Sequence, residues 1–460
     1  MTPDPRKTFA TEVVSRLQHA GHRALWAGGC VRDLVLGVEP ADYDVATDAT
    51  PEEVMRLFRR TVPVGVSFGV VRVLGPPGAG EVEVATFRSD GAYLDGRHPT
   101  EVHFGSPEAD AARRDFTING MFLDPLTGEV IDYVGGRDDL TRGVVRAIGD
   151  PAARFAEDKL RLIRAVRFAA RFGFAIEPRT LAALVAMTGQ IRVVAVERIA
   201  QELRRMLVHA SRARAMDLAM EAGLVAAVLP PLVKMKGLFQ GKPVQPQGDL
   251  WDHTLLVLEH LPATPSFPLA FAALLHDAGK PESKGLQDGR TTFHNHEYVG
   301  RRIAEGLGRE LKLANAERER VTWLVESHQV LAEPTKLREA KLKRLLAQPG
   351  IEDLLALHRA DALASTGDAR HVDYCEWYRR AEPTGPINPP PLVTGHDLAR
   401  LGLTPGPAFA TILEQVREAQ LERVVASKRE ALEWLERLPI VPTTDTDTDT
   451  DTDADAGAAD

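Results

Sequence analysis

A glycine turn and an acidic pair near the N-terminus constrain the fold more than any other feature. HRALWAGG (22–29) is typical of a short strand that runs into a glycine turn, and VRDLVLG (31–37) of the helix that follows. DYDVAT (42–47) alternates polar and apolar residues, which predicts a second strand. A lone glycine turn or a lone DxD is common by chance. The ordered set strand–GGxVRD–helix–DxD–strand is much more specific.

The residue types in this set suit a metal-dependent reaction of phosphates. Residues two apart on a strand point to the same face, so Asp42 and Asp44 are expected to project together and bind one or two Mg²⁺ ions. Gly28 and Gly29 leave backbone amides open at a strand-to-helix turn, where a phosphate is favoured. Arg32 adds positive charge at the same place.

The charge of the chain is unevenly distributed. Its 460 residues have a formal net charge of −9, which taken alone argues against a nucleic-acid partner. The acidic run TDTDTDTDTDADAGAAD cannot bury enough apolar surface to fold, so 441–460 is expected to be a disordered tail, and its seven Asp account for most of that charge. Residues 142–214 instead hold fourteen Arg and one Lys against six acids. Local, salt-dependent binding of RNA is therefore expected there.

The remaining composition indicates a globular intracellular protein. Hydrophobic residues make up 44% of the chain, enough for full-sized cores. No apolar run reaches the length of a membrane span, and the N-terminus lacks the order of a secretion signal. The two cysteines, Cys30 and Cys375, suit a reducing cytoplasm better than a disulfide scaffold.

Strand and helix patterns divide the chain into an α+β part and a helical part. VVRVL and EVEVATFR predict two further strands, TPEEVMRLFRR predicts a capped helix, and the chain from 150 onward is nearly all helical. A proline-rich break at 382–393 precedes a last helical stretch near 405–438. The predicted segments are an α+β part (1–141), an arginine-rich helical part (142–214), a longer helical part (215–381), a C-terminal helical region (382–440) and the acidic tail (441–460).

A family resemblance follows from these motifs taken in order. LWAGGCVRDLVLGVEPADYDVATDATPEEV resembles the opening motif of the class II tRNA nucleotidyltransferases, which add CCA to tRNA 3′ ends, and of the related bacterial poly(A) polymerases. VEVATFR, YLDGRHPTEV, RRDFTING, GDPAARFAEDKLRLIRAVRFAARFGF and ERIAQEL extend the resemblance over residues 20–210, and more loosely to about 438. It implies a polymerase-β-like head (1–141), a helical neck that selects the nucleotide and binds RNA (142–214), a helical body with a metal-binding domain (215–381) and a helical tail region (382–440).

The resemblance also implies roles for residues of the head. Asp42 and Asp44 resemble the catalytic metal-binding pair, and Gly28, Gly29 and Arg32 the contacts to the triphosphate and the primer end. In RRDFTING, Arg114 and Asp115, with Asn119 nearby, resemble the residues that hold the incoming nucleotide. Glu83 is a candidate third carboxylate, with Glu81 or a plain surface role as alternatives.

EDKLR (157–161) offers a way to choose a base. If the segment is helical, Asp158 and Arg161 share one face, and an acceptor beside a donor can pair with the amino group and ring nitrogen of cytosine or adenine. The resemblance implies that this pair is an amino-acid template; a surface salt bridge is the alternative. Arg198 and Glu202 are expected to brace the neck helix. The implied reaction is attack of the tRNA 3′-hydroxyl on the α-phosphate of ATP or CTP, with two metals and no identifiable general base.

The segment FRSDGAYLDGRHP (87–99) bears on which nucleotides are added. It holds Arg88, Tyr93, Asp95 and Arg97 among glycines, and in the family such a flexible loop accompanies addition of the final A, whereas enzymes that add only CC have it truncated. Arg97-His98-Pro99 and VGVSFGVV (64–71) depart from the usual family pattern. An enzyme that adds only A, with a separate CC-adding partner, therefore remains an alternative; a poly(A) polymerase ranks third.

A second ordered set lies in the body. WDH, LLHDAGK, FHNHE, ESH and RAD resemble the HD metal-phosphohydrolase domain, and imidazole with carboxylate suits a divalent transition metal. The implied ligands are His253, His276, Asp277, His296, His328 and Asp361, with His294 as a competitor of His296. If active, the domain would cleave phosphoesters on RNA ends. Two other hypotheses stay open: the HD domain as the main activity with an RNA-binding head, and a non-enzymatic RNA-binding protein.

Overall fold

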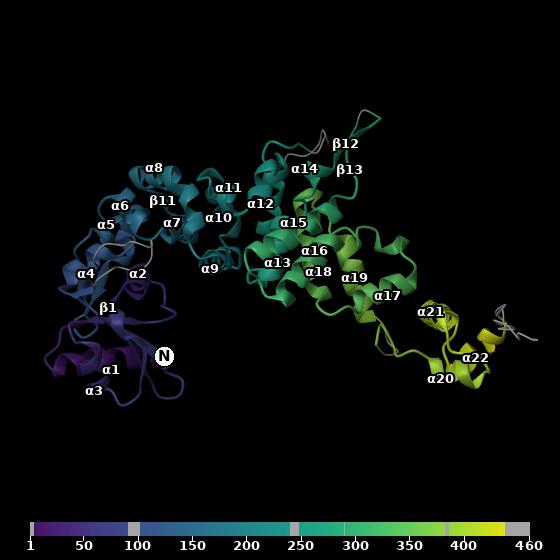
Figure 1. Ribbon diagram of the computed structural model, residues 1–460, viewed down its shortest axis with the longest axis horizontal. Helices are drawn as coiled ribbons and strands as arrows, with labels where there is room; N and C mark the ends of the chain where they lie inside the picture. Colours follow the sequence, from purple (N-terminus) through teal and green to yellow (C-terminus); the bar gives the residue numbers. More distant parts are fainter. Residues whose placement is uncertain (1–3, 91–101, 240–247, 289, 382–385, 438–460) are drawn as a thin grey trace, which may run out of the picture. The chain divides into compact units, whose positions relative to one another are not determined.

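The computed structural model describes residues 4–90, 102–239, 248–288, 290–381 and 386–437 (Figure 1). The chain forms two compact units, one made of the residues up to Gln329 with Ala356–Ala369, the other of Val330–Leu355 and the residues from Arg370 onward. Across the described ranges, no helix has both the length and the apolar character needed to cross a membrane. The predicted acidic tail (441–460) and most of the predicted loop lie outside the described residues.

A mixed seven-stranded sheet forms the head, in the order β3-β4-β5-β2-β1-β8-β9. Only the β2–β5 pair is parallel; the other pairs of this sheet are antiparallel. The strands are β1 (Ala24–Ala27), β2 (Asp44–Thr47), β3 (Thr61–Gly65), β4 (Val70–Leu74), β5 (Glu81–Thr86), β8 (Met121–Leu123) and β9 (Val130–Asp132). Strands β6 (Arg88–Asp90) and β7 (Val102–Phe104) pair with each other in a separate two-stranded ribbon.

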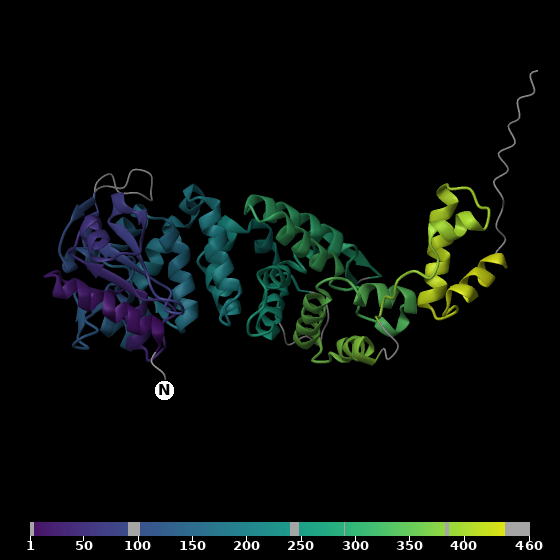
Figure 2. The ribbon, with the colours of Figure 1, turned by 90° about the horizontal axis from the view of Figure 1, so that it is seen from below.

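The two faces of the sheet carry different helices. On one face Ala27, Ala46 and Phe122 pack with Phe87 and with Ala111 of helix α4. Helices α1 and α3 pack on each other and on the sheet, and α1 crosses it as the purple helix of Figure 2. The helices of the head are α1 (Pro5–His19), α2 (Gly29–Val35), α3 (Pro51–Leu57), α4 (Pro107–Arg113) and α5 (Gly136–Arg142), with 3₁₀ turns at Val66–Phe68 and Thr117–Asn119.

Local signals account for the helix starts. Thr50 and Glu53 form a complete capping box at the start of α3, with Pro51 at its first position, as TPEEV predicts. Gly28 precedes α2 with a φ of +75°, a conformation open to glycine at little cost. The capped helix and the strand before the glycine turn are therefore where the sequence predicts them.

A backbone bridge joins the neck to the head, between Phe116 and Ala147. Within the neck, Val144–Val145 (β10) pairs in parallel with Ala175–Ile176 (β11). Helix α7 buries its apolar side while most of its arginines stay partly accessible. The elements that follow α5 are α6 (Pro151–Glu157), α7 (Leu160–Phe172), α8 (Pro178–Met187), α9 (Val196–Leu207), α10 (Arg212–Glu221) and α11 (Leu224–Val228), with 3₁₀ turns at Thr188–Val193 and Pro230–Met235.

Helices also build the HD region of the first unit. Its centre is α13, which is buried along its whole length except for one partly buried position and packs against α12 and α16. The elements are α12 (Leu250–His260), α13 (Phe267–Leu275), α14 (Lys280–Ser283), α15 (His296–Glu310) and α16 (Asn315–Ser327), with a hairpin of β12 (Lys284–Gln287) and β13 (Arg290–Phe293). Helix α18 (Ile351–Ser365) adds its C-terminal part to this unit.

The second unit has its own apolar core. Val393, Leu398, Val416 and Leu435 are buried together there. Its helices are α17 (Glu339–Leu346), α19 (Arg370–Ala381), α20 (Gly395–Arg400), α21 (Pro407–Leu421) and α22 (Lys428–Glu436), with a 3₁₀ turn at Pro334–Lys336. The predicted domain boundaries at 141, 214, 381 and 440 stay predictions.

Candidate active site and metal centre

Three carboxylates meet at the start of strand β2. Asp44 is its first residue and lies directly across from Glu83 in the parallel register with β5. The DxD pattern predicts that Asp42 is also a strand residue. That prediction was wrong, because Asp42 precedes β2. Tyr43 between them is buried against Trp26, at 4.7 Å between ring centroids, while both aspartates stay exposed.

The electrostatics of this cluster favour a cation. Desolvation, then Glu83 and then Asp42 raise the pKa of Asp44 to about 7. Three neighbouring carboxylates repel one another, and hard divalent cations prefer such oxygen ligands. The residues therefore fit a divalent metal, and Glu83 rather than Glu81 is the third acidic neighbour, since Glu81 pairs with Arg72 at 3.2 Å.

The glycine turn is shaped by Arg114. A Cβ atom on Gly28 would lie 2.8 Å from the Nη1 atom of Arg114. Arg114 is held by two hydrogen bonds to one carboxylate oxygen of Asp110, at 3.1 and 2.9 Å. The turn therefore needs glycine both for its backbone conformation and for the room that the guanidinium takes.

Arg32 links the head to the neck. Its buried guanidinium donates to Asp33 at 2.8 and 2.6 Å and to the amide oxygen of Asn119 at 2.7 Å. It also stacks over the ring of Phe172 in the neck, at 4.6 Å from the centroid. Asn119 in turn donates to Asp115 at 3.0 Å. Arg32 is thus fixed by both parts of the chain.

Asp115 continues this network into the neck. It accepts two hydrogen bonds from Arg164, at 2.9 and 2.6 Å. Although burial opposes its charge, Arg164 outweighs that effect and holds the pKa of Asp115 at about 2. Arg164 was not singled out from the sequence, where it is one of several arginines on α7; its partner lies 49 residues away.

One pocket collects most of the predicted nucleotide-binding residues. It encloses about 410 Å³, a size typical of small-ligand sites. The predicted residues that line it are Gly28, Gly29, Arg32, Asp44, Arg114, Asp115, Asn119, Asp158 and Arg161. Sequence reasoning missed Arg113, Leu160, Arg164 and Phe168, which also line it. Asp42 does not line this pocket.

The geometry at EDKLR differs from the prediction. The segment is not one helix: Asp158 is extended, with φ −142° and ψ 106°, and separates α6 from α7. Its carboxylate accepts from the backbone N–H of Leu160 at 3.0 Å, which supports the start of α7. The prediction that Asp158 and Arg161 share one helix face was therefore wrong, although both residues line the pocket.

The side chains that bond Asp158 and Arg161 also differ from expectation. Arg198 bonds Asp158 at 2.8 and 3.3 Å and also lines the pocket. The prediction that it braces the neck rather than touches substrate stays a prediction. Arg161 bonds Glu157 at 2.6 Å instead of forming a salt bridge with Asp158. Glu202 is buried and bonds Arg167 at 2.5 Å and Arg205 at 2.9 Å.

The predicted loop has only its base within the described residues. Arg88 lies in strand β6 and donates to the carbonyl of Phe68, so it belongs to a ribbon rather than to a flexible loop. Tyr93, Asp95 and Arg97 fall in 91–101, outside the described residues.

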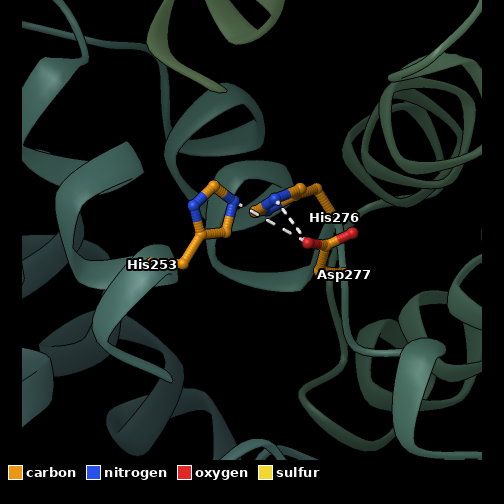
Figure 3. A group of neighbouring side chains, drawn as sticks. All are labelled: His253, His276 and Asp277. Carbon is orange, nitrogen blue, oxygen red and sulfur yellow. Dashed lines mark ion pairs between the residues drawn. The ribbon is translucent and has the colours of Figure 1, made fainter. Parts of the chain in front are cut away.

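The six predicted ligands of the HD region come together in space. Figure 3 shows His253, His276 and Asp277 converging from α12 and from the end of α13. The Oδ2 atom of Asp277 lies 3.3 Å from the Nε2 atom of His276 and 3.8 Å from that of His253. Asp361 lies 3.3 Å from His253.

A second group shares the same aspartate. The Oδ1 atom of Asp277 lies 3.3 Å from the Nε2 atom of His296 and 3.7 Å from that of His328. The Nε2 atoms of His296 and His328 are 3.2 Å apart. Asp277 thus has one oxygen in each group. The competing His294 is exposed and contacts Gln287 instead, so the geometry favours His296.

The histidines are oriented as ligands. The Nδ1 atoms of His276, His296 and His328 each contact a backbone carbonyl, at 2.7–2.9 Å, which directs Nε2 into the cluster. The Nε2 atom of His276 and the Oδ1 atom of Asp277 are buried without a hydrogen bond. Burial disfavours a charged His276, but Asp277 outweighs it and raises its pKa. These residues fit a divalent cation. Lys280, which pairs with Asp277 at 2.6 Å, was missed.

Comparison with known proteins places these sites in known domains. Residues 24–146 match the poly A polymerase head domain, 173–235 the probable RNA- and SrmB-binding site of polymerase A, and 250–366 the HD domain. The chain therefore combines a head of the poly A polymerase type with an HD domain, and the predicted α+β class with a polymerase-β-like head is confirmed.

Among its relatives are CCA-adding enzymes, which confirms the resemblance. It is 45% identical over 199 residues to that of Limosilactobacillus fermentum, covering 43% of this chain and 49% of the relative. With that of Anoxybacillus flavithermus it shares 41% over 228 residues, covering 49% and 56%. The chain thus spans about half the length of the curated relatives it matches. The Bacillus stearothermophilus CCA-adding enzyme in complex with CTP is similar over 95% of this chain and 98% of its own, with a TM-score of 0.72 and 27% identity.

Proposed function

We propose that the chain is a tRNA nucleotidyltransferase that adds CMP and AMP to the tRNA 3′ end without a nucleic-acid template. One observation carries the proposal: a single pocket joins the carboxylate Asp44 to the base-reading candidates Asp158 and Arg161. The similar structure with CTP supports this reading of the pocket. The reaction takes place on RNA, and the cytoplasm is the expected location.

The pocket has the chemistry to choose between bases. Asp158 can accept a hydrogen bond from the amino group of cytosine or adenine, and Arg161 can donate to a ring acceptor. Uracil and guanine present the opposite order of donor and acceptor. Arg198 holds the Asp158 carboxylate at the pocket wall and so fixes the acceptor in place.

The head would work through metal ions and positioned charge. Asp42 and Asp44, with Glu83 beside them, would hold Mg²⁺, which stabilises the attacking and leaving oxygens when bound. The RNA 3′-oxygen forms a bond to the α-phosphorus, the bond to the bridging oxygen breaks, pyrophosphate leaves, and the hydroxyl proton passes to solvent. Arg32 and Arg114 would orient the triphosphate.

The test uses purified protein, Mg²⁺, CTP and ATP with three tRNA transcripts, ending before CCA, after C and after CC. Extension of all three supports CCA addition; extension of the CC end alone supports the A-only alternative with a separate CC-adding enzyme. Long A tracts would support a poly(A) polymerase. No extension of any end would overturn the proposal. Glu83→Ala should reduce incorporation far more than its matched control Glu81→Ala.

A second activity is favoured by the HD cluster. We propose that the cluster would hold divalent transition-metal ions through two groups of side chains that share Asp277, and that it hydrolyses phosphoesters on RNA ends, such as 2′,3′-cyclic phosphates or 2′-phosphates. The observation behind it is that five of the six predicted ligands form two groups that share Asp277, while Asp361 pairs with His253 of the first group. Metal analysis should give about two ions per chain, and His276→Ala should lose metal and hydrolysis. The exposed His294→Ala is the matched control. Unchanged hydrolysis in His276→Ala would remove this activity from the site.

A further inference from the structure

The ring of Phe168 on helix α7 lies among three positive charges. The guanidinium carbons of Arg32, Arg164 and Arg167 lie over this ring, at 5.4, 5.2 and 4.3 Å from its centroid. The negative face of an aromatic ring attracts a cation within about 6 Å. Phe168 is only 4% exposed and packs edge-on against Phe116, at 5.8 Å between ring centroids. One buried ring of the neck therefore attracts arginines from both the head and the neck.

The ring holds these arginines in a way that their carboxylate partners do not. Arg32 donates to Asp33, and Arg164 donates to Asp115, in both cases through Nε and Nη2 at 2.6–2.9 Å. Such a carboxylate neutralises the charge and holds one edge of the guanidinium. A guanidinium also stacks on an aromatic face, and that contact holds its plane. The ion pairs and the ring together thus fix both the position and the tilt of the two guanidinium groups.

Two of the three arginines face the nucleotide pocket. Arg32 and Arg164 line it together with Phe168, whereas Arg167 does not. Among the described residues that line this pocket, Phe168 is the one aromatic side chain. An aromatic side chain at a nucleotide site commonly stacks on a base, but an exposed fraction of 4% leaves almost no ring surface for one. The ring therefore acts on the pocket through the arginines that it holds.

We infer that Phe168 is a positioning residue, which holds the guanidinium groups of Arg32 and Arg164 in the orientation that binds the triphosphate of the incoming nucleotide. This inference rests on the proposed function and adds Phe168 and Arg164 to it. CTP and ATP carry the same triphosphate, so loss of the orientation should weaken the binding of both equally. The choice of base is assigned to other residues, Asp158 and Arg161, so it should not change.

Graded fluorination of the Phe168 ring in the full chain tests the inference. Fluorine withdraws electron density from the ring face and weakens its attraction for cations, while the shape of the ring changes little. With one, two and three fluorines on Phe168, the KM for CTP and the KM for ATP should rise in steps, to about tenfold with three. The kcat at saturating nucleotide, and the ratio of kcat/KM for CTP to that for UTP, should each stay within about twofold.

The same series at Phe116 is the matched control. Phe116 is buried beside Phe168, and within the described part of the chain no arginine or lysine lies over its ring. Fluorination there alters the packing of the same two rings without altering a cation contact, so both KM values should stay within about twofold. Equal KM values throughout the Phe168 series, or an equal rise in the Phe116 series, would overturn the inference.

A binding experiment separates this inference from the proposed function. Calorimetry with Mg²⁺ and without RNA measures the Kd of CTP and the Kd of inorganic tripolyphosphate. Three fluorines on Phe168 should raise both Kd values about tenfold, because both ligands meet the two arginines through phosphates. A higher Kd for CTP with an unchanged Kd for tripolyphosphate would overturn the inference. If both Kd values rise and no tRNA end is extended, the inference stands and only the proposed function fails.

Discussion

Arg198 holds the carboxylate of Asp158 with two hydrogen bonds, at 2.8 and 3.3 Å, across 40 residues of sequence. Asp158 lies at the break between two helices, where its side chain is not fixed by a continuous helical backbone. The long-range ion pair therefore defines the direction in which this carboxylate faces the nucleotide pocket.

Removal of Arg198 should weaken base selection. In Arg198→Ala, Asp158 loses the partner that orients it, so we expect the preference for CTP over UTP, as a ratio of kcat/KM, to fall about tenfold. The measurement is single-nucleotide incorporation on a tRNA ending before CCA. Arg192→Ala removes the same charge from an exposed site outside the pocket and should leave the ratio unchanged. An equal loss in both variants would contradict a specific role for Arg198.

The metal-free head should become less stable as pH rises. Because the folded-state pKa of Asp44 is raised to about 7, from an ordinary value of 3.8, the folded protein keeps its proton where the unfolded chain has lost it. The resulting loss of stability begins near pH 4 and is complete above pH 7. In chelator, Asp44→Asn should therefore melt at a higher temperature than the parent chain at pH 8, with the difference shrinking towards pH 4. Mg²⁺ at pH 8 should narrow the difference.

Removal of metal from the HD cluster should destabilise the first unit without silencing the head. A cation there would neutralise the buried Asp277 and the partly exposed Asp361, and would give a partner to the buried Nε2 atom of His276. We expect a chelator specific for transition metals to lower the melting temperature of the parent chain, and to have little effect on His276→Ala. Nucleotide incorporation with Mg²⁺ restored should persist in both. A chelator effect of equal size in His276→Ala would place the metal elsewhere.

Neutralising Glu202 should lower the free energy of unfolding. This buried carboxylate faces Arg167 and Arg205, so Glu202→Gln leaves both guanidinium groups without their counter-charge. Arg164, at 4.0 Å, keeps its pair with Asp115. Breaking a buried ion pair in this way costs about 3–5 kcal/mol. Urea unfolding measures the loss. Glu197→Gln, on the same helix but in a solvent-exposed pair with Lys312, should leave the free energy of unfolding nearly unchanged. Equal losses would contradict the burial argument.

The parts of the site that local patterns encode were predictable. The glycine turn at Gly28, the strand at Asp44 and the capped helix at Thr50 each depend on neighbours within a few residues. The six HD residues were found because their order and spacing resemble a known domain. The division of the four histidines into two groups around Asp277 required coordinates, since it depends on which oxygen of Asp277 each histidine approaches.

The contacts that were not predictable join distant segments. EDKLR contains no glycine or proline, and its only local signal for a break is Asp158, whose carboxylate accepts from the backbone N–H of Leu160 at the start of α7. The second contact of that carboxylate, with Arg198, joins segments 40 residues apart. Arg164 is one of several arginines on α7, and only its contact with Asp115 distinguishes it. Long-range pairing of this kind has no periodicity to reveal it in a single sequence.

The parallel pairing of β10 with β11 has a consequence for exchanging parts between proteins of this type. A head that ends at Arg142 would lose the strand Val144–Val145 and the bridge from Phe116 to Ala147, and would expose the ring of Phe116, which packs on Phe168. Chimeras joined there should aggregate, whereas chimeras joined after Leu207 keep these pairings intact. The smallest unit that can be exchanged intact is therefore the head together with the first part of the neck, and we expect the two to be exchanged together.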